Sequence, residues 1–175
     1  MRLFIAVLLN DEVKIALQTL QEQIKPQAYK GSFTRPENFH LTLAFLGETP
    51  EDRVPALRQI IKDSNFPPFG ITFNRTGCFT HSRKELWWVG VDPDDTALPQ
   101  LTSLHRQLID RLEKESFPVD TRPFNAHITL GREIRHSGPI VLDCPKIKVA
   151  VGRISLMKSE RSGGVLKYTE LSAQD

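Results

Sequence analysis

The chain contains two near-identical stretches of sequence, HLTL at residues 40–43 and HITL at residues 127–130, which indicate an internal repeat. They start 87 residues apart (40 to 127), close to half of the 175-residue length. Each continues an alternation of polar and apolar residues that is typical of a β-strand, and each follows an Arg-Pro pair, at 35–36 and 122–123. Side chains two residues apart in a strand point the same way. Each copy therefore presents an imidazole and a hydroxyl on one face and anchors its other face in a core.

Two such strands facing each other would create a cleft that contains His40, Thr42, His127 and Thr129. This set suits in-line displacement at phosphorus, because a neutral imidazole can take a proton from water while a protonated one gives a proton to the leaving oxygen. A histidine pKa near 6.5 makes both forms available near neutral pH. The threonine hydroxyls can donate to the non-bridging oxygens. One His-x-Thr in a strand is commonplace, but two copies at half-chain spacing favour a paired site without a metal or a covalent intermediate.

The pattern outside the motifs predicts an α+β fold. Short strand patterns outnumber helical ones, and too few helices separate them for a parallel βαβ sheet, so antiparallel pairs with helices on one sheet face are expected. Strands are expected at 2–9, 39–46, 71–79, 86–91, 127–131, 147–157 and 166–171, helices at 11–25, 49–61 and 94–112, with Asp11 as an N-cap, and a loop at 27–37.

Composition excludes several classes of protein. Hydrophobic residues make up 39% and charged residues 25%, as in ordinary globular domains, and the net charge of +2 excludes a general nucleic-acid coat or a polybasic membrane anchor. No apolar run approaches the roughly 20 residues that span a bilayer. Cys78 and Cys144 are too few and too far apart for a disulfide framework or a CxxC site, which indicates reduced cysteines in a cytoplasmic protein.

The paired motifs resemble those of the 2H phosphoesterase superfamily. More closely, the chain resembles the bacterial and archaeal RNA 2′,3′-cyclic phosphodiesterases, also called 2′-5′ RNA ligases. The resemblance runs nearly from end to end. It includes RLFIAV at 2–7, PENFHLTLAFLG at 36–47, RPF at 122–124 before the second motif, and a glycine-containing hairpin that leads to Tyr168 and Thr169.

The resemblance implies one domain over residues 1–175, with one motif in each half of the chain. Its two pseudo-symmetric lobes would each be an antiparallel sheet with helices on the outer face, around a central cleft. It also implies hydrolysis of an RNA 2′,3′-cyclic phosphate to a 2′-phosphate without a cofactor, with His40 as proton donor and His127 as acceptor. The reverse reaction would join RNA ends in 2′-5′ linkage. The nearly equivalent halves do not by themselves separate the acid from the base.

Arg132 lies two residues beyond the second motif, where the family commonly has a basic residue. A guanidinium there could clamp phosphate oxygens together with Thr42 and Thr129. However, Arg132 does not share strand parity with His127 or Thr129, so its reach depends on where the strand bends. A solvated surface arginine is the alternative interpretation.

Other residues carry weaker signals. His105 lies within a predicted helix and has a structural or solvated role by default. Trp87 and Trp88 alternate on their strand, so at most one faces the core and the other could stack a base. The turn at His81–Lys84 could contact RNA phosphates as an exposed hairpin tip.

Three other functions are alternatives. A 2H phosphodiesterase for a small nucleotide, such as a cyclic ADP-ribose phosphate or a 2′-5′ oligoadenylate, would use the same motifs and differ at loops 27–37 and 81–84. A non-catalytic RNA- or nucleotide-binding module would not need two intact His-Thr pairs. A metal hydrolase would need ligand spacings such as HExxH, which are absent from the sequence. The expected partner is therefore RNA with 2′,3′-cyclic phosphate ends, or a small nucleotide, bound by a monomer without a membrane. The sequence leaves the particular RNA open.

Overall fold

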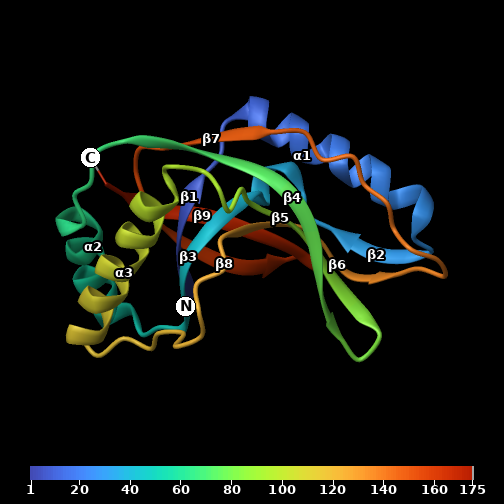
Figure 1. The fold of residues 1–175 in the computed structure, drawn as a ribbon. Helices are drawn as coiled ribbons and strands as arrows, with labels where there is room; N and C mark the ends of the chain where they lie inside the picture. Colours follow the sequence, from blue (N-terminus) through green and yellow to red (C-terminus); the bar gives the residue numbers. More distant parts are fainter. Residues whose placement is uncertain (175) are drawn as a thin grey trace.

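The computed structural model describes residues 1–174, which form two antiparallel sheets and three α-helices (Figure 1). The four-stranded sheet has the order β3-β1-β8-β9 and the five-stranded sheet the order β2-β6-β5-β4-β7. The α+β fold predicted from the sequence is confirmed. The strands are β1 (Arg2–Leu8), β2 (Lys30–Phe33), β3 (His40–Glu48), β4 (Phe69–His81), β5 (Lys84–Val91), β6 (His127–Arg135), β7 (Ile147–Val151), β8 (Ser155–Ser162) and β9 (Val165–Ala173); the α-helices are α1 (Asp11–Ile24), α2 (Val54–Asp63) and α3 (Leu98–Lys114).

The internal repeat is a strand–helix–strand unit. In the first copy β1 leads through α1 to β3, and in the second β5 leads through α3 to β6; in both copies the two strands pair antiparallel. Each helix crosses over to the other copy's sheet, because α1 packs on β6 and β7 while α3 packs on β3 beside α2 (Figure 1). The two motif strands therefore belong to different sheets that are held against each other by exchanged helices.

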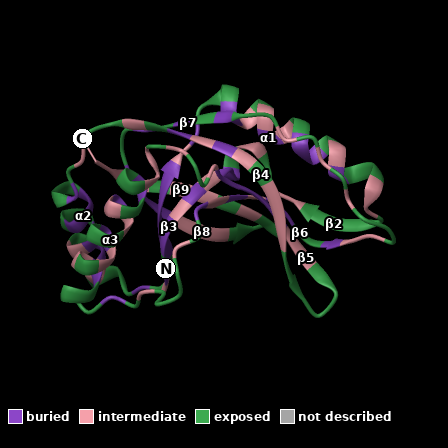
Figure 2. Cartoon of the chain, viewed as in Figure 1, coloured by how far each residue is buried: buried purple, intermediate pink, exposed green. Residues whose placement is uncertain are grey.

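One buried apolar cluster fills the space between the sheets and the helices (Figure 2). The buried faces of α1 and α3 follow the spacing of three to four residues that was expected. Residues 3–7 of β1 are all buried, so this strand is covered on both faces. Its other face contributes Phe4 and Ala6 to a small second cluster with Met157, which lies beneath His40 and Tyr168.

Three sequence predictions differ from the structure. The segment 27–37, expected to be a loop, contains β2, a largely exposed strand that exists because its backbone pairs with β6. The strand expected at 147–157 is two strands, β7 and β8, which lie in different sheets. The N-cap of α1 is Asn10 and not Asp11, because the Asn10 Oδ1 accepts a hydrogen bond from the Val13 N–H at 2.9 Å. None of the helices within residues 1–174 is long and apolar enough to cross a membrane.

Candidate active site

Both motif strands begin at their histidine and bulge just after their threonine. On β6, Thr129 lies opposite Trp88 and Gly131 opposite Trp87, so Leu130 is an extra residue in the ladder. Such a bulge reverses the side-chain parity beyond it. Arg132 is thereby returned to the face of Thr129, and both line the same cavity. In a regular strand Arg132, three residues after Thr129, would point to the opposite face. The bulge is the local distortion that brings the guanidinium to the face of the motif.

The same bulge occurs at the equivalent position of β3. Ala6 lies opposite Thr42 and Ile5 opposite Ala44, which leaves Leu43 as the extra residue. The residue returned to the cleft here is Phe45, whose side chain is 48% exposed. The two copies thus share their geometry but present a phenyl ring in one and a guanidinium in the other.

The motifs meet crosswise in two adjoining pockets. The basic pocket, a cavity of about 290 Å³, takes His40 from the first motif and Thr129 from the second. The aromatic pocket, a cavity of about 360 Å³, takes His127 from the second motif and Thr42 from the first. The structure therefore brings together all five residues expected at the site. The side chains that give the pockets their names are Arg35, Arg132 and Arg161 in the basic pocket, and Phe45, Phe79 and Phe124 in the aromatic pocket.

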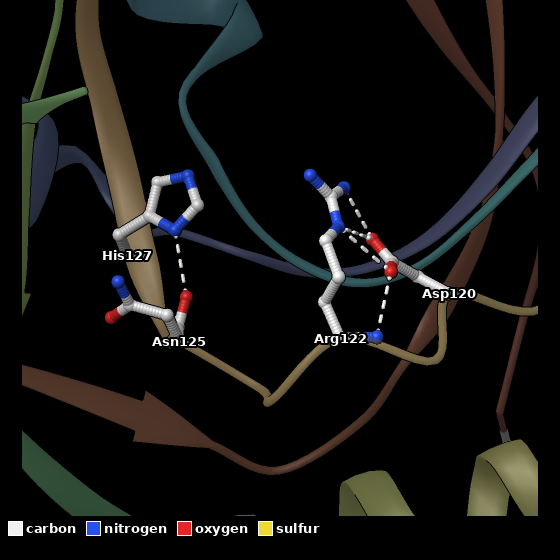
Figure 3. A network of polar contacts seen from close by, with 4 residues as sticks. All are labelled: Asp120, Arg122, Asn125 and His127. Atoms are coloured by element: carbon white, nitrogen blue, oxygen red, sulfur yellow. Dashed lines mark hydrogen bonds and ion pairs between the residues drawn. The ribbon is translucent and has the colours of Figure 1, made fainter. Parts of the chain in front are cut away.

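Each catalytic candidate is oriented by a carbonyl two residues before it. The Nδ1 of His40 lies 2.7 Å from the carbonyl oxygen of Asn38, and the Nδ1 of His127 lies 2.7 Å from that of Asn125 (Figure 3). A carbonyl only accepts, so Nδ1 carries the hydrogen in both rings and Nε2 is the atom free to exchange a proton.

Aromatic neighbours hold each imidazole from the side. The His40 ring centroid lies 4.8 Å from that of Phe4 and 5.2 Å from that of Tyr168. The His127 centroid lies 5.3 Å from that of Phe79 and 6.3 Å from that of Trp88. Both rings are therefore fixed before any ligand binds, as precise proton transfer requires.

The repeat extends beyond the two His-x-Thr motifs. It reads Arg-Pro-x-Asn-x-His-x-Thr-Leu at residues 35–43 and 122–130, so the two asparagines are part of it. Asn38 is buried; its Nδ2 donates to the Leu166 carbonyl at 2.9 Å, and its Oδ1 accepts from the Tyr168 N–H at 3.3 Å. It fastens β9 beside His40. The repeated asparagine is visible in the sequence at the same 87-residue offset as the motifs, outside their His-x-Thr core.

A buried amide on α1 supports the second motif from behind. The Gln21 Nε2 donates to the carbonyl of Thr34 at 2.7 Å and to that of Leu130, the bulge residue, at 2.8 Å. This helix thereby fixes both the loop and the bulge that form one wall of the basic pocket. No periodic pattern marks this role, because Gln21 reads as an ordinary helix residue.

Burial makes both imidazoles weak bases in the unliganded protein. It lowers the pKa of His40 to about 4; the bond to the Asn38 carbonyl opposes this shift, and the positive charges of Arg132 and His127 add to it. Burial also lowers the pKa of His127, against the bond to Asn125 and with the help of Arg132. Both rings are thus neutral near pH 7 in the empty site. A bound phosphate would offset Arg132 and raise both pKa values.

The lowered pKa of His40 predicts a pH dependence of stability. Because the folded pKa of about 4 lies below the usual 6.5, the unfolded chain binds more protons between these values. The free energy of unfolding should therefore fall as the pH drops from 6.5 to 4, by about 3 kcal/mol from this residue alone. Chemical denaturation of the native protein and of His40→Gln at several pH values measures it. An equally steep acid loss in both proteins would contradict the assignment.

The match to known families follows this geometry. Residues 7–88 and 91–166, which carry both motifs and every residue that lines the two pockets except Tyr168, match the model of the LigT-like phosphoesterase family. The chain belongs to the LigT-like phosphoesterase family. The expectation drawn from the paired motifs is thus confirmed at the level of family and fold.

Relatives across bacteria and archaea support this membership. An RNA 2′,3′-cyclic phosphodiesterase of Archaeoglobus fulgidus is 31% identical over 144 residues, which are 82% of this chain and 78% of that protein. One of Escherichia coli K12 is 29% identical over 171 residues, 97% of this chain and 93% of that protein. The crystal structure of E. coli LigT complexed with 3′-AMP superposes with a TM-score of 0.84 at 28% identity, covering 98% of this chain and 95% of that one.

The residues with weaker signals have definite places in this LigT-like fold. His105 stacks flat on Phe124, with ring centroids 3.8 Å apart, and lines the aromatic pocket. Trp87 and Trp88 are both buried, so neither offers an open face to a base. The ring of Trp88 lies next to His127 and packs against Gly77. A Cβ at position 77 would lie 2.5 Å from the Trp88 ring, so the glycine leaves the space that this ring occupies. Among residues 1–174, no group of three or more His, Cys, Asp or Glu could hold a metal ion.

Proposed function

We propose that this phosphoesterase hydrolyses the 2′,3′-cyclic phosphate ends of RNA to 2′-phosphates with His40 and His127 as its acid and base. The observation that carries the proposal is the crosswise pairing of two oriented His-Thr sets, with Arg132 beside them. The activity named for the A. fulgidus and E. coli relatives supports this substrate class.

In this mechanism the cyclic phosphate lies where the two pockets meet. Arg132, Thr42 and Thr129 hold the non-bridging oxygens, where negative charge is stabilised in the transition state. His127 Nε2 takes a proton from water as the oxygen bonds to phosphorus, while His40 gives its proton to O3′ as the P–O3′ bond breaks. The products are a 2′-phosphate and a free 3′-hydroxyl.

The substrate itself charges the acid in this scheme. With a pKa of about 4 in the empty site, His40 is largely neutral at pH 7, so the anion must raise that pKa on binding. The arrangement couples the acid's protonation to occupancy by an anionic ligand. Attack by a 5′-hydroxyl in place of water, with the same acid and base, joins the two ends in a 2′-5′ linkage, and by microscopic reversibility the same groups can cleave that linkage. The proposed setting is a monomer acting on RNA ends in the cytoplasm.

A cyclic-phosphate dinucleotide assay with and without EDTA tests the proposal. Turnover should survive chelation, because two imidazoles supply the proton transfers, and ³¹P NMR should show a 2′-phosphate as the sole monoester. Loss of turnover that a divalent ion restores, or a 3′-phosphate product, would contradict the two-histidine mechanism or its polarity. RNase A, which uses no metal and gives 3′-phosphates, serves as the control for both readouts.

A further inference from the structure

The aromatic pocket has the surface of a nucleoside site and not that of a phosphate site. The side chains of Phe45 and Phe79 are 48% and 42% exposed, and both line this pocket. Phe124, stacked on His105, forms a third ring on its wall. Exposed apolar side chains gathered in one concavity mark a place that binds something apolar. Partly exposed rings beside a proton-transferring group suit a nucleobase.

The two pockets differ sharply in charge. The basic pocket holds Arg35, Arg132 and Arg161, and no carboxylate is among the described residues that line it. The aromatic pocket has one arginine, Arg122, whose Nε lies 2.9 Å and 3.0 Å from the two carboxylate oxygens of Asp120 (Figure 3). This pair leaves the aromatic pocket without net charge. An RNA chain with its phosphates fits the first pocket, and an uncharged group fits the second.

The asymmetry falls on matched positions of the repeat. Arg35 and Arg122 occupy the same position in the two copies, but Arg35 faces a carboxylate only at 3.8 Å, on Glu37. Arg132 and Phe45 also occupy one position, each returned to the cleft by its bulge. In both comparisons the aromatic pocket has the less charged partner, Phe45 of the first copy and the Asp120-paired Arg122 of the second, and the basic pocket has the arginine without a close carboxylate.

We propose that the aromatic pocket binds an uncharged nucleoside through its base, with its 5′-oxygen at His127. The basic pocket then holds the RNA strand that carries the reacting phosphate. The assignment rests on the proposed function, in which His127 handles the attacking oxygen and His40 handles O3′. It gives the cleft a direction: the phosphate-bearing strand enters over the arginines, and a 5′-hydroxyl end enters over the phenyl rings.

The reaction that uses both pockets is cleavage of a 2′-5′ junction. His40 takes the proton of the neighbouring 3′-hydroxyl as O3′ bonds to phosphorus, and the P–O5′ bond breaks while His127 gives its proton to O5′. The products are a 2′,3′-cyclic phosphate and a nucleoside with a free 5′-hydroxyl, so no water is consumed. A 5′-phosphate on that nucleoside would lie beside Arg122, which is already paired with Asp120.

The test compares two substrates that differ by one nucleoside. The first is a dinucleotide ending in a 2′,3′-cyclic phosphate, and the second is the same dinucleotide joined 2′-5′ to adenosine. For Phe45→Ala, the ratio of kcat/KM for the junction to kcat/KM for the cyclic end should fall about tenfold, as expected for one lost base–aromatic stack. Phe45→Tyr, which keeps the ring, should restore the ratio. Tyr29→Ala, an exposed aromatic outside both pockets, is the matched control.

The outcomes separate this inference from the proposed function. An unchanged ratio in Phe45→Ala, or an unchanged ratio when adenosine is replaced by an abasic ribose, overturns the nucleoside assignment. Hydrolysis of the cyclic end with no cleavage of the junction by the native enzyme also overturns it. Inactivity of the native enzyme on the cyclic end overturns the proposed function instead. Thermal melts of each variant ensure that a lost fold is not read as a lost subsite.

Discussion

His40→Ala and His127→Ala should each lower turnover of a cyclic-phosphate dinucleotide by about 10²–10⁴-fold, the usual worth of one general acid or base. Without His40 the leaving oxygen departs as an alkoxide, and without His127 neutral water must attack. These losses correspond to roughly 3–5 kcal/mol of transition-state stabilisation. The double variant should lose less than the sum, because each transfer depends on the other.

The controls for these variants follow from the packing around the rings. His40 lies between Phe4 and Tyr168, so its removal opens a small space, and the melting temperature of each variant must be measured with its activity. Asn38 and Asn125 orient the imidazoles through backbone carbonyls, which side-chain substitution leaves in place. If either single variant keeps activity within about threefold of the native protein, that histidine is not catalytic.

Arg132→Ala should lower kcat/KM by about 10–100-fold, since a hydrogen bond to a charged group contributes roughly 1.5–3 kcal/mol. Arg132→Lys should recover part of the loss, because the charge returns without the bidentate fork. A second effect is specific to the guanidinium charge, which lowers the pKa of both histidines. Its removal should raise both values and shift the pH profile of kcat/KM to higher pH.

A matched surface arginine serves as the control for this prediction. Arg58 is exposed on α2, away from both pockets, and Arg58→Ala should leave activity and the pH profile unchanged. Equal activity of the native protein, Arg132→Ala and Arg132→Lys would return Arg132 to the role of a solvated surface residue.

Most of the fold could be predicted because it is encoded in local periodicity. The alternation around both motifs and the leucine spacing of α3 each reflect one buried face, which the sequence displays directly. Strand β2 could not be predicted, since its four residues owe their structure to pairing with β6. The exchange of α1 and α3 between the sheets is likewise a property of the tertiary packing.

The site residues that occur in both motifs could be predicted from the sequence. Those whose position depends on a β-bulge or on a tertiary contact could not. His40, His127 and their threonines follow from the repeat. The place of Arg132 depends on the bulge at Leu130, which no alternation pattern shows. The Gln21 amide reaches motif strand β6 from a helix 109 residues earlier in the chain, and Asp120 neutralises Arg122 within a single loop. Sequence spacing alone does not report such contacts.

The pH dependence of the two single histidine variants tests the paired acid and base most directly. In the native enzyme, kcat should be bell-shaped, and the limbs of kcat/KM should lie at lower pH because the empty site lowers both pKa values. The residual activity of His40→Ala should only rise with pH, as the base His127 loses its proton. The residual activity of His127→Ala should only fall with pH, as the acid His40 loses its proton. Limbs assigned the other way would reverse the roles, and flat native profiles between about pH 4 and 9, a range that spans histidine titration, would contradict the two-histidine mechanism.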